Sequence, residues 1–116
     1  MLQITPDDFD ELVRRGLDAV PQGLLDQLDN VVVLVEPESP PDHPPLLGLY
    51  IGVPLTSRGA NYAGGSPDTI MIYRNPILRM CHTYDQVVEQ VRVTVIHELA
   101  HHFGISDERL DELGWA

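Results

Sequence analysis

The sequence predicts an α+β fold in a single domain, residues 1–116, in which a short mixed β-sheet of about three to four strands packs on N-terminal helices and a C-terminal helix. Three observations support this prediction. Apolar residues recur at helical spacing near both ends of the chain, and short β-branched runs lie between these two segments, separated by loops rich in proline and glycine. A chain of 116 residues can bury one hydrophobic core but not two.

The first helix is expected over residues 6–19. Thr5 is a suitable N-cap, Pro6 suits the first helical position, and acidic residues follow in the first turn. The core-facing stripe consists of Phe9, Leu12, Val13, Leu17 and Val20. Residues 23–28 suggest a short second helix that packs its leucines into the core.

Three strands are expected next. Residues 31–35 form a continuous β-branched run, typical of a strand buried on both faces. Residues 46–53 predict a second strand, and residues 69–74 a third, which ends at Asn75-Pro76. The proline-rich residues 36–45 and the long segment 54–68 are predicted loops; His43 is expected to be solvated, whereas Arg58, Asn61 and Tyr62 are either solvent-exposed or substrate contacts.

A long helix follows a connector over residues 77–82. Thr83 is its predicted N-cap, and an apolar stripe runs through the helix to Phe103. Gly104 can adopt the left-handed conformation that ends a helix, and Ser106 then caps a short last helix over residues 107–114. Because valines are mediocre helix formers, burial must stabilise most of the long helix.

Residues 97–107 read H-E-x-x-H-x-x-G-x-x-D. His97 and His101 are four residues apart, so on a helix their imidazoles project from one face and can bind the same Zn²⁺. The turn at Gly104 can bring Asp107 back as the third ligand. This set leaves a fourth position open for water, as in catalytic zinc sites, and Glu98 is placed to act as general base on that water.

Two residues of this segment have alternative roles. Asp107 is also an acidic residue in the first turn of a helix, where a carboxylate is favourable in itself. His102 follows His101 directly and points about 100° away from it, too far to share its metal. His102 is therefore either packed or hydrogen-bonded to a neighbour, and we favour a structural role. Cys81 and His82 fit no simple site with the His97/His101 pair and are also interpreted as structural.

The stretch H-E-L-A-H-H-F-G-I-S-D resembles the signature of the minimal zincin-like metallopeptidases of bacteria, which are small relatives of the metzincins, with Asp107 where metzincins have a third His. Residues 70–77 also resemble the strand that precedes the active-site helix in this family. The resemblance implies a small zincin-like domain with a C-terminal active-site helix. Metzincins carry a downstream Met-turn beneath the metal, whereas only nine residues follow Asp107 and none is Met, so rules about that turn do not transfer.

These features predict a zinc-dependent peptidase, with one Zn²⁺ per chain held by His97, His101 and Asp107 and with Glu98 as general base. Its activity can be latent or narrow in specificity. If strand 69–75 is a sheet edge beside the cleft, a peptide or protein substrate can pair with it, although an edge strand without that role is equally compatible. Two alternatives remain: a metal-dependent endoribonuclease of the rRNA-processing type, and a non-catalytic zinc-stabilised interaction domain.

Composition bears on partners and location. Eighteen acidic residues, seven arginines and no lysine give a net charge of −11, which disfavours nucleic acid as a partner. No apolar run approaches the ~18 residues of a membrane helix, so no membrane association is predicted. The N-terminus resembles no signal peptide, and the single Cys81 cannot form an internal disulfide. These features predict a cytoplasmic protein, whose oligomeric state the sequence leaves open.

Overall fold

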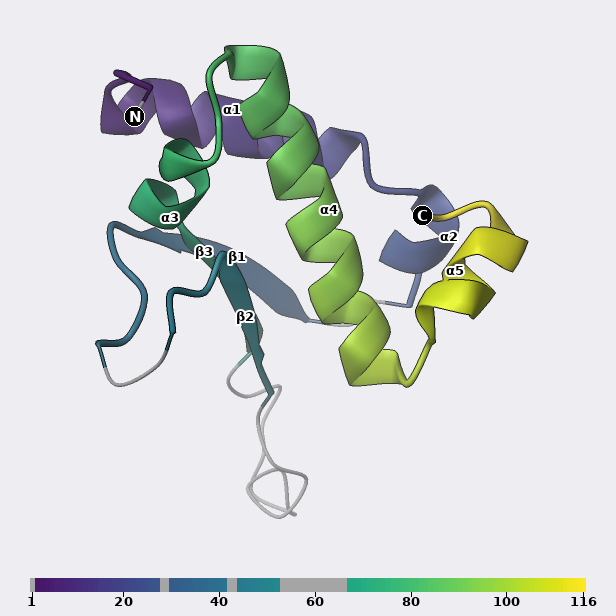
Figure 1. The fold of residues 1–116 in the computed structure, drawn as a ribbon. Helices are drawn as coiled ribbons and strands as arrows, with labels where there is room; N and C mark the ends of the chain where they lie inside the picture. The colour runs from purple at the N-terminus through teal and green to yellow at the C-terminus, as the bar shows by residue number, and fades with distance from the viewer. Residues whose placement is uncertain (1, 28–29, 42–43, 53–66) are drawn as a thin grey trace.

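A computed structural model describes residues 2–27, 30–41, 44–52 and 67–116. The predicted solvated His43 and the candidate substrate contacts Arg58, Asn61 and Tyr62 lie outside these ranges. Within them the chain forms five helices and three strands (Figure 1): α1 Pro6–Asp18, α2 Gln22–Leu25, β1 Val31–Glu36, β2 Gly48–Ile51, β3 Asp68–Tyr73, α3 Arg74–Arg79, α4 Tyr84–Phe103 and α5 Asp107–Leu113. The predicted α+β fold with a short mixed sheet is confirmed.

The strand order in the sheet is β1-β3-β2. β3 pairs in parallel with β1 along its whole length, and residues 69–72 also pair antiparallel with β2. The prediction that strand 69–75 is a sheet edge is therefore wrong, because neighbouring strands occupy both of its sides. Residues 74 and 75 are already helical. The strand edge next to α4 belongs instead to β2, which contacts that helix more extensively than β3 does.

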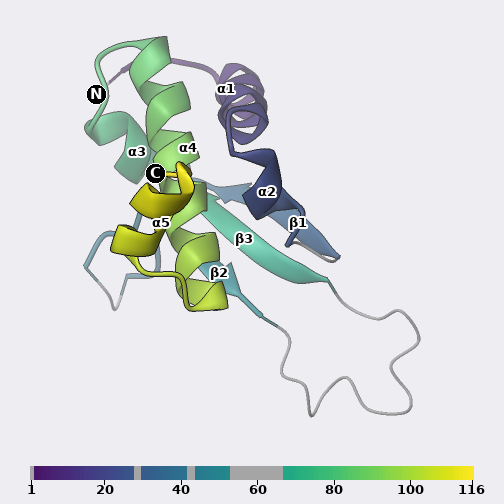
Figure 2. The same ribbon diagram turned by 90° about the vertical axis from the view of Figure 1, so that its right-hand side faces the viewer.

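β1 is not buried on both faces as its sequence suggested. Its burial alternates along the strand, and Val32 and Leu34 expose 38% and 51% of their surface. The physical reason is that the helices cover one face of the sheet (Figure 2), so alternate side chains of β1 point to the opposite, uncovered face. Val33 and Val35 face the core together with Ile70 and Ile72 of β3.

The helix ends follow the predicted capping residues. The hydroxyl oxygens of Thr5, Thr83 and Ser106 accept hydrogen bonds from the third backbone N–H that follows each of them. The predicted connector over residues 77–82 is partly helical, since α3 begins at Arg74 directly after β3. Pro76 is tolerated there because the first turn of a helix needs no intrahelical N–H donor.

α4 is the central helix of the core and packs on α1 as well as on the sheet. Its buried side chains are Val87, Val91, Thr94, Val95, Ile96, Leu99 and Ala100. α1 approaches it closely at Gly16, where a Cβ atom would lie 2.7 Å from Val91 Cγ1. Among the described residues, no helix combines the length and hydropathy that crossing a membrane requires.

Candidate metal centre and active site

The last two turns of α4 carry two neighbouring rows of polar side chains. His97 and His101 form one row, and their exposed rings lie 6.4 Å apart, centre to centre, with 23° between their planes. Glu98 and His102 form the other row, one residue further along the helix. Residues four apart lie on one helix face, so each row points in its own direction.

The His97/His101 row lines a cleft of about 250 Å³ between α4 and residues 45–48. The remaining wall is mostly apolar and consists of Pro45, Leu46, Leu47, Gly48, Gln90, Val93 and Thr94, together with Glu98. A larger groove of about 450 Å³ lies between α1 and β1, but it contains none of the predicted site residues. His97, Glu98 and His101 therefore line the smaller of these two cavities.

The Glu98/His102 row faces the edge strand β2. Oε2 of the half-buried Glu98 accepts a hydrogen bond of 3.1 Å from the backbone N–H of Tyr50. The ring of His102 stacks on the ring of Tyr50 with 3.9 Å between ring centres and 18° between planes. The ring of the exposed His102 is thus engaged in a stack with Tyr50.

At the end of α4, the chain reverses direction at Gly104. This residue has φ +70°, and the N–H of the next residue, Ile105, donates to the carbonyl of Ala100 at 2.7 Å. Asp107 then stands exposed as the first residue of α5. Among the described residues, no three His, Cys, Asp or Glu side chains gather in a group that could hold a metal ion. Asp107 as third ligand therefore stays a prediction, and its alternative role in the first turn of a helix agrees with its place in α5.

The histidine pair fits zinc by its donor chemistry and its spacing. Two imidazoles on one tetrahedral zinc have ring centres roughly 5 Å apart, because each Zn–N bond is about 2.0–2.1 Å long. The 6.4 Å between His97 and His101 exceeds this by little more than 1 Å, which rotation of the two exposed side chains can supply. These two residues would hold the ion, with Asp107 as the predicted third ligand.

Tyr73 and Arg109 are two further polar residues near the motif. Burial and the charges of Glu36 and Glu98 raise the pKa of the Tyr73 phenol, so this side chain stays neutral. Arg109 forms an ion pair with Glu112 on α5 at 2.9 Å, which engages its guanidinium on the same helix.

Sequence reasoning missed Gly48 and Tyr50 of β2, which meet the second row, and Asp68 of β3, which accepts a hydrogen bond from the Tyr50 hydroxyl. A signal for them existed in the i, i+4 spacing of Thr94, Glu98 and His102, which marks a second face of the helix beside the metal-binding face. Which strand that face would meet depends on strand order, and the sequence did not reveal this order.

Comparisons with known proteins identify the family of this chain. A family model described as "Zincin-like metallopeptidase" matches residues 28–115. Among solved structures, a conserved hypothetical protein from Thermo thermophilus is similar, with 27% sequence identity and a TM-score of 0.56; the match covers 86% of this chain and 94% of that one. No curated protein matches the chain.

Proposed function

This chain belongs to the zincin-like metallopeptidase family, and from that premise we propose that it hydrolyses peptide bonds in a zinc-dependent reaction. His97, His101 and Asp107 would hold the zinc ion, and Glu98 would be the general base. Bound zinc supplies Lewis acidity, which lowers the pKa of a coordinated water and polarises the scissile carbonyl. The proposal needs a base beside the ion and a place for the peptide.

The observation that carries the proposal is the position of Glu98. Glu98 lines the same cleft as both histidines, and one of its two carboxylate oxygens, Oε2, accepts a hydrogen bond from the Tyr50 N–H. The other oxygen, Oε1, is then available to take the proton of the attacking water and to deliver it to the leaving amine. A base that is anchored through Oε2 keeps its orientation during both transfers.

The substrate in this proposal is a peptide in extended conformation, paired with β2 and not with strand 69–75. Leu47 O accepts from Tyr73 N of the central strand at 3.0 Å, so by the alternation of antiparallel strands Gly48 and Tyr50 direct their backbone groups away from β3. The Tyr50 N–H is already bonded to Glu98, whereas the backbone groups of Gly48 lie beside the cleft, where an added strand can reach them. The apolar wall formed by Leu46, Leu47 and Val93 favours an uncharged apolar side chain in the substrate.

The test is cleavage of a synthetic peptide library by zinc-loaded protein, with the fragments identified by mass spectrometry. We expect cleavage beside apolar residues, loss of cleavage on removal of zinc with a chelator, and a fall of roughly 10²–10⁴-fold in kcat for Glu98→Gln with zinc retained. Glu89→Gln is the matched control, because this exposed residue lies on the same helix and bonds Arg92.

Two outcomes would contradict the proposal. If Glu98→Gln keeps zinc and cleaves as fast as the wild type, Glu98 is not the base. If the zinc-loaded wild type cleaves no peptide but unfolds on loss of zinc, the non-catalytic, zinc-stabilised interaction domain is the better description.

A further inference from the structure

One face of α4 follows the edge strand β2 residue by residue. Thr94, Glu98 and His102 are spaced four apart on the helix, and they face Gly48, Tyr50 and Gly52, which are spaced two apart along the strand segment. A Cβ atom on Gly48 would lie 2.6 Å from Thr94 Cγ2, and one on Gly52 would lie 3.6 Å from His102 Cε1. Glu98, the general base proposed above, is thus the middle of three α4 residues that contact the segment of β2.

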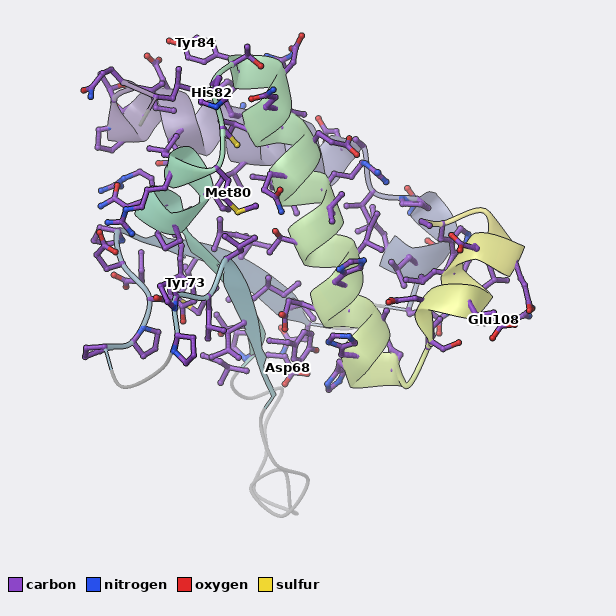
Figure 3. The ribbon with its side chains drawn as sticks, viewed as in Figure 1. Asp68, Tyr73, Met80, His82, Tyr84 and Glu108 are labelled. Atoms are coloured by element: carbon purple, nitrogen blue, oxygen red, sulfur yellow. The ribbon has the colours of Figure 1, made fainter. Side chains whose placement is uncertain are left out.

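Tyr50 is the residue of β2 that this row holds most firmly. Its ring stacks on His102 at 3.9 Å, and its hydroxyl donates a 2.7 Å hydrogen bond to Oδ2 of Asp68 on β3. Asp68 is itself 6% exposed (labelled in Figure 3). With the ring held by α4 at one point and by β3 at another, the side chain of Tyr50 has little freedom to turn.

The backbone N–H of this same residue donates to Glu98. We infer that His102 is a positioning residue for Glu98: by stacking on Tyr50 it holds the Tyr50 N–H over the carboxylate, and this N–H orients the carboxylate towards the metal-binding row. The catalytic part of this inference rests on the proposed peptidase function, whereas the structural part concerns only the hydrogen bond between Tyr50 and Glu98.

The geometry argues for positioning through the stack and against a role of the imidazole as metal ligand or base. His102 points about 100° away from His101. Its ring lies nearly parallel to that of Tyr50 and meets Phe103 edge-on, with 5.0 Å between ring centres. These are contacts of a flat ring, so a different flat ring at the same place is expected to preserve them.

Three variants separate these roles. His102→Ala removes the stack, and His102→Phe restores a flat ring without nitrogen atoms. His82→Ala is the matched control, because His82 is an exposed histidine that precedes the N-terminus of α4, whereas His102 lies near its C-terminus (His82 is labelled in Figure 3). Tyr50→Phe keeps the stack but loses the hydrogen bond to Asp68, and it serves as a second probe if His102→Ala does not fold.

The first readout needs no activity: hydrogen exchange of the Tyr50 amide, followed by NMR. We expect exchange at least about tenfold faster in His102→Ala than in the wild type, and wild-type exchange in His102→Phe and His82→Ala. Tyr50→Phe is expected to accelerate exchange less than His102→Ala does. Unchanged exchange in His102→Ala, or equal acceleration in His102→Phe, would overturn the inference.

The second readout is kinetic and uses a peptide found in the library screen. With one zinc per chain retained, His102→Ala is expected to lower kcat by roughly 10–100-fold with little change in KM, and His102→Phe to recover most of the loss. A loss expressed only in KM would mean that His102 supports substrate binding and not the base. If the wild type cleaves nothing, the proposed function fails, and the amide exchange still decides the positioning.

Discussion

Gly48→Ala probes the contact between β2 and α4 by adding a single methyl group. The new Cβ would lie 2.6 Å from Thr94 Cγ2 and 2.9 Å from the backbone carbonyl oxygen of Met71. Both distances are shorter than carbon contacts in folded proteins allow, so some atoms must move. The Met71 oxygen belongs to the central strand and cannot shift without disturbing the ladder between β3 and β2, so β2 is the element that has to move.

The magnitude follows from two opposing effects. Forcing an extra methyl group into a packed site costs about 1–3 kcal/mol. Replacing glycine reduces the entropy of the unfolded chain and offsets about 0.4–1 kcal/mol of this cost. We therefore expect a net loss of about 1–2 kcal/mol in the free energy of unfolding, which lowers Tm by roughly 3–10 °C for a domain of this size.

The assay is thermal unfolding followed by circular dichroism, with Gly52→Ala as matched control. Gly52 lies just beyond β2, its added Cβ would meet nothing nearer than 3.6 Å, and its φ is not positive. We expect Gly52→Ala to unfold at or slightly above the wild-type temperature. Adding Thr94→Ser to Gly48→Ala removes the Cγ2 contact but not that with Met71, so it should restore only part of the stability. Equal Tm values for Gly48→Ala and Gly52→Ala would refute the reasoning.

Two other predictions concern regions away from the site. Gly16→Ala should destabilise the domain by about 1–3 kcal/mol although alanine is the better helix former, because its Cβ would lie 2.7 Å from Val91 Cγ1; urea unfolding measures this, and a more stable variant would contradict it. Hydrogen bonds from the side chains of Asn75 and Arg79 hold the pKa of Glu38 below its ordinary value of 4.5. A carboxyl whose folded-state pKa is depressed stabilises the fold above its ordinary pKa, and this contribution disappears as the pH falls through the folded-state value. The Tm of the wild type should therefore fall more steeply below pH 4.5 than that of Glu38→Gln, and parallel curves would contradict this assignment.

Much of the local structure could be predicted because the interactions that determine it are short in sequence. The caps at Thr5, Thr83 and Ser106 involve residues three apart, and the left-handed turn at Gly104 depends on that residue's lack of a side chain. The placement of His97 and His101 on one helical row likewise needs only the helix itself. These features were expected from the sequence, and the structure contains all of them.

The errors arose where the environment of a strand mattered. β1 reads as a strand buried on both faces, yet the helices cover only one face of the sheet and Leu34 is exposed on the other. β3 was expected to be an edge strand and is the central one. Strand order depends on pairings between segments far apart in the chain, and composition alone does not encode which side of a strand remains unpaired.

By itself, then, the sequence determined that two imidazoles and a carboxylate lie on neighbouring faces of one helix, because spacings of one and four residues on a helix have a fixed geometry. Only the tertiary structure decided what the carboxylate and the neighbouring His102 meet. Tyr50 is 48 residues from Glu98 in the chain. The two come into contact because β2 pairs with β3 on the side opposite β1, and α4 packs against β2. Such a contact depends on the whole fold, since it requires both the order of the strands in the sheet and the packing of α4 across that sheet.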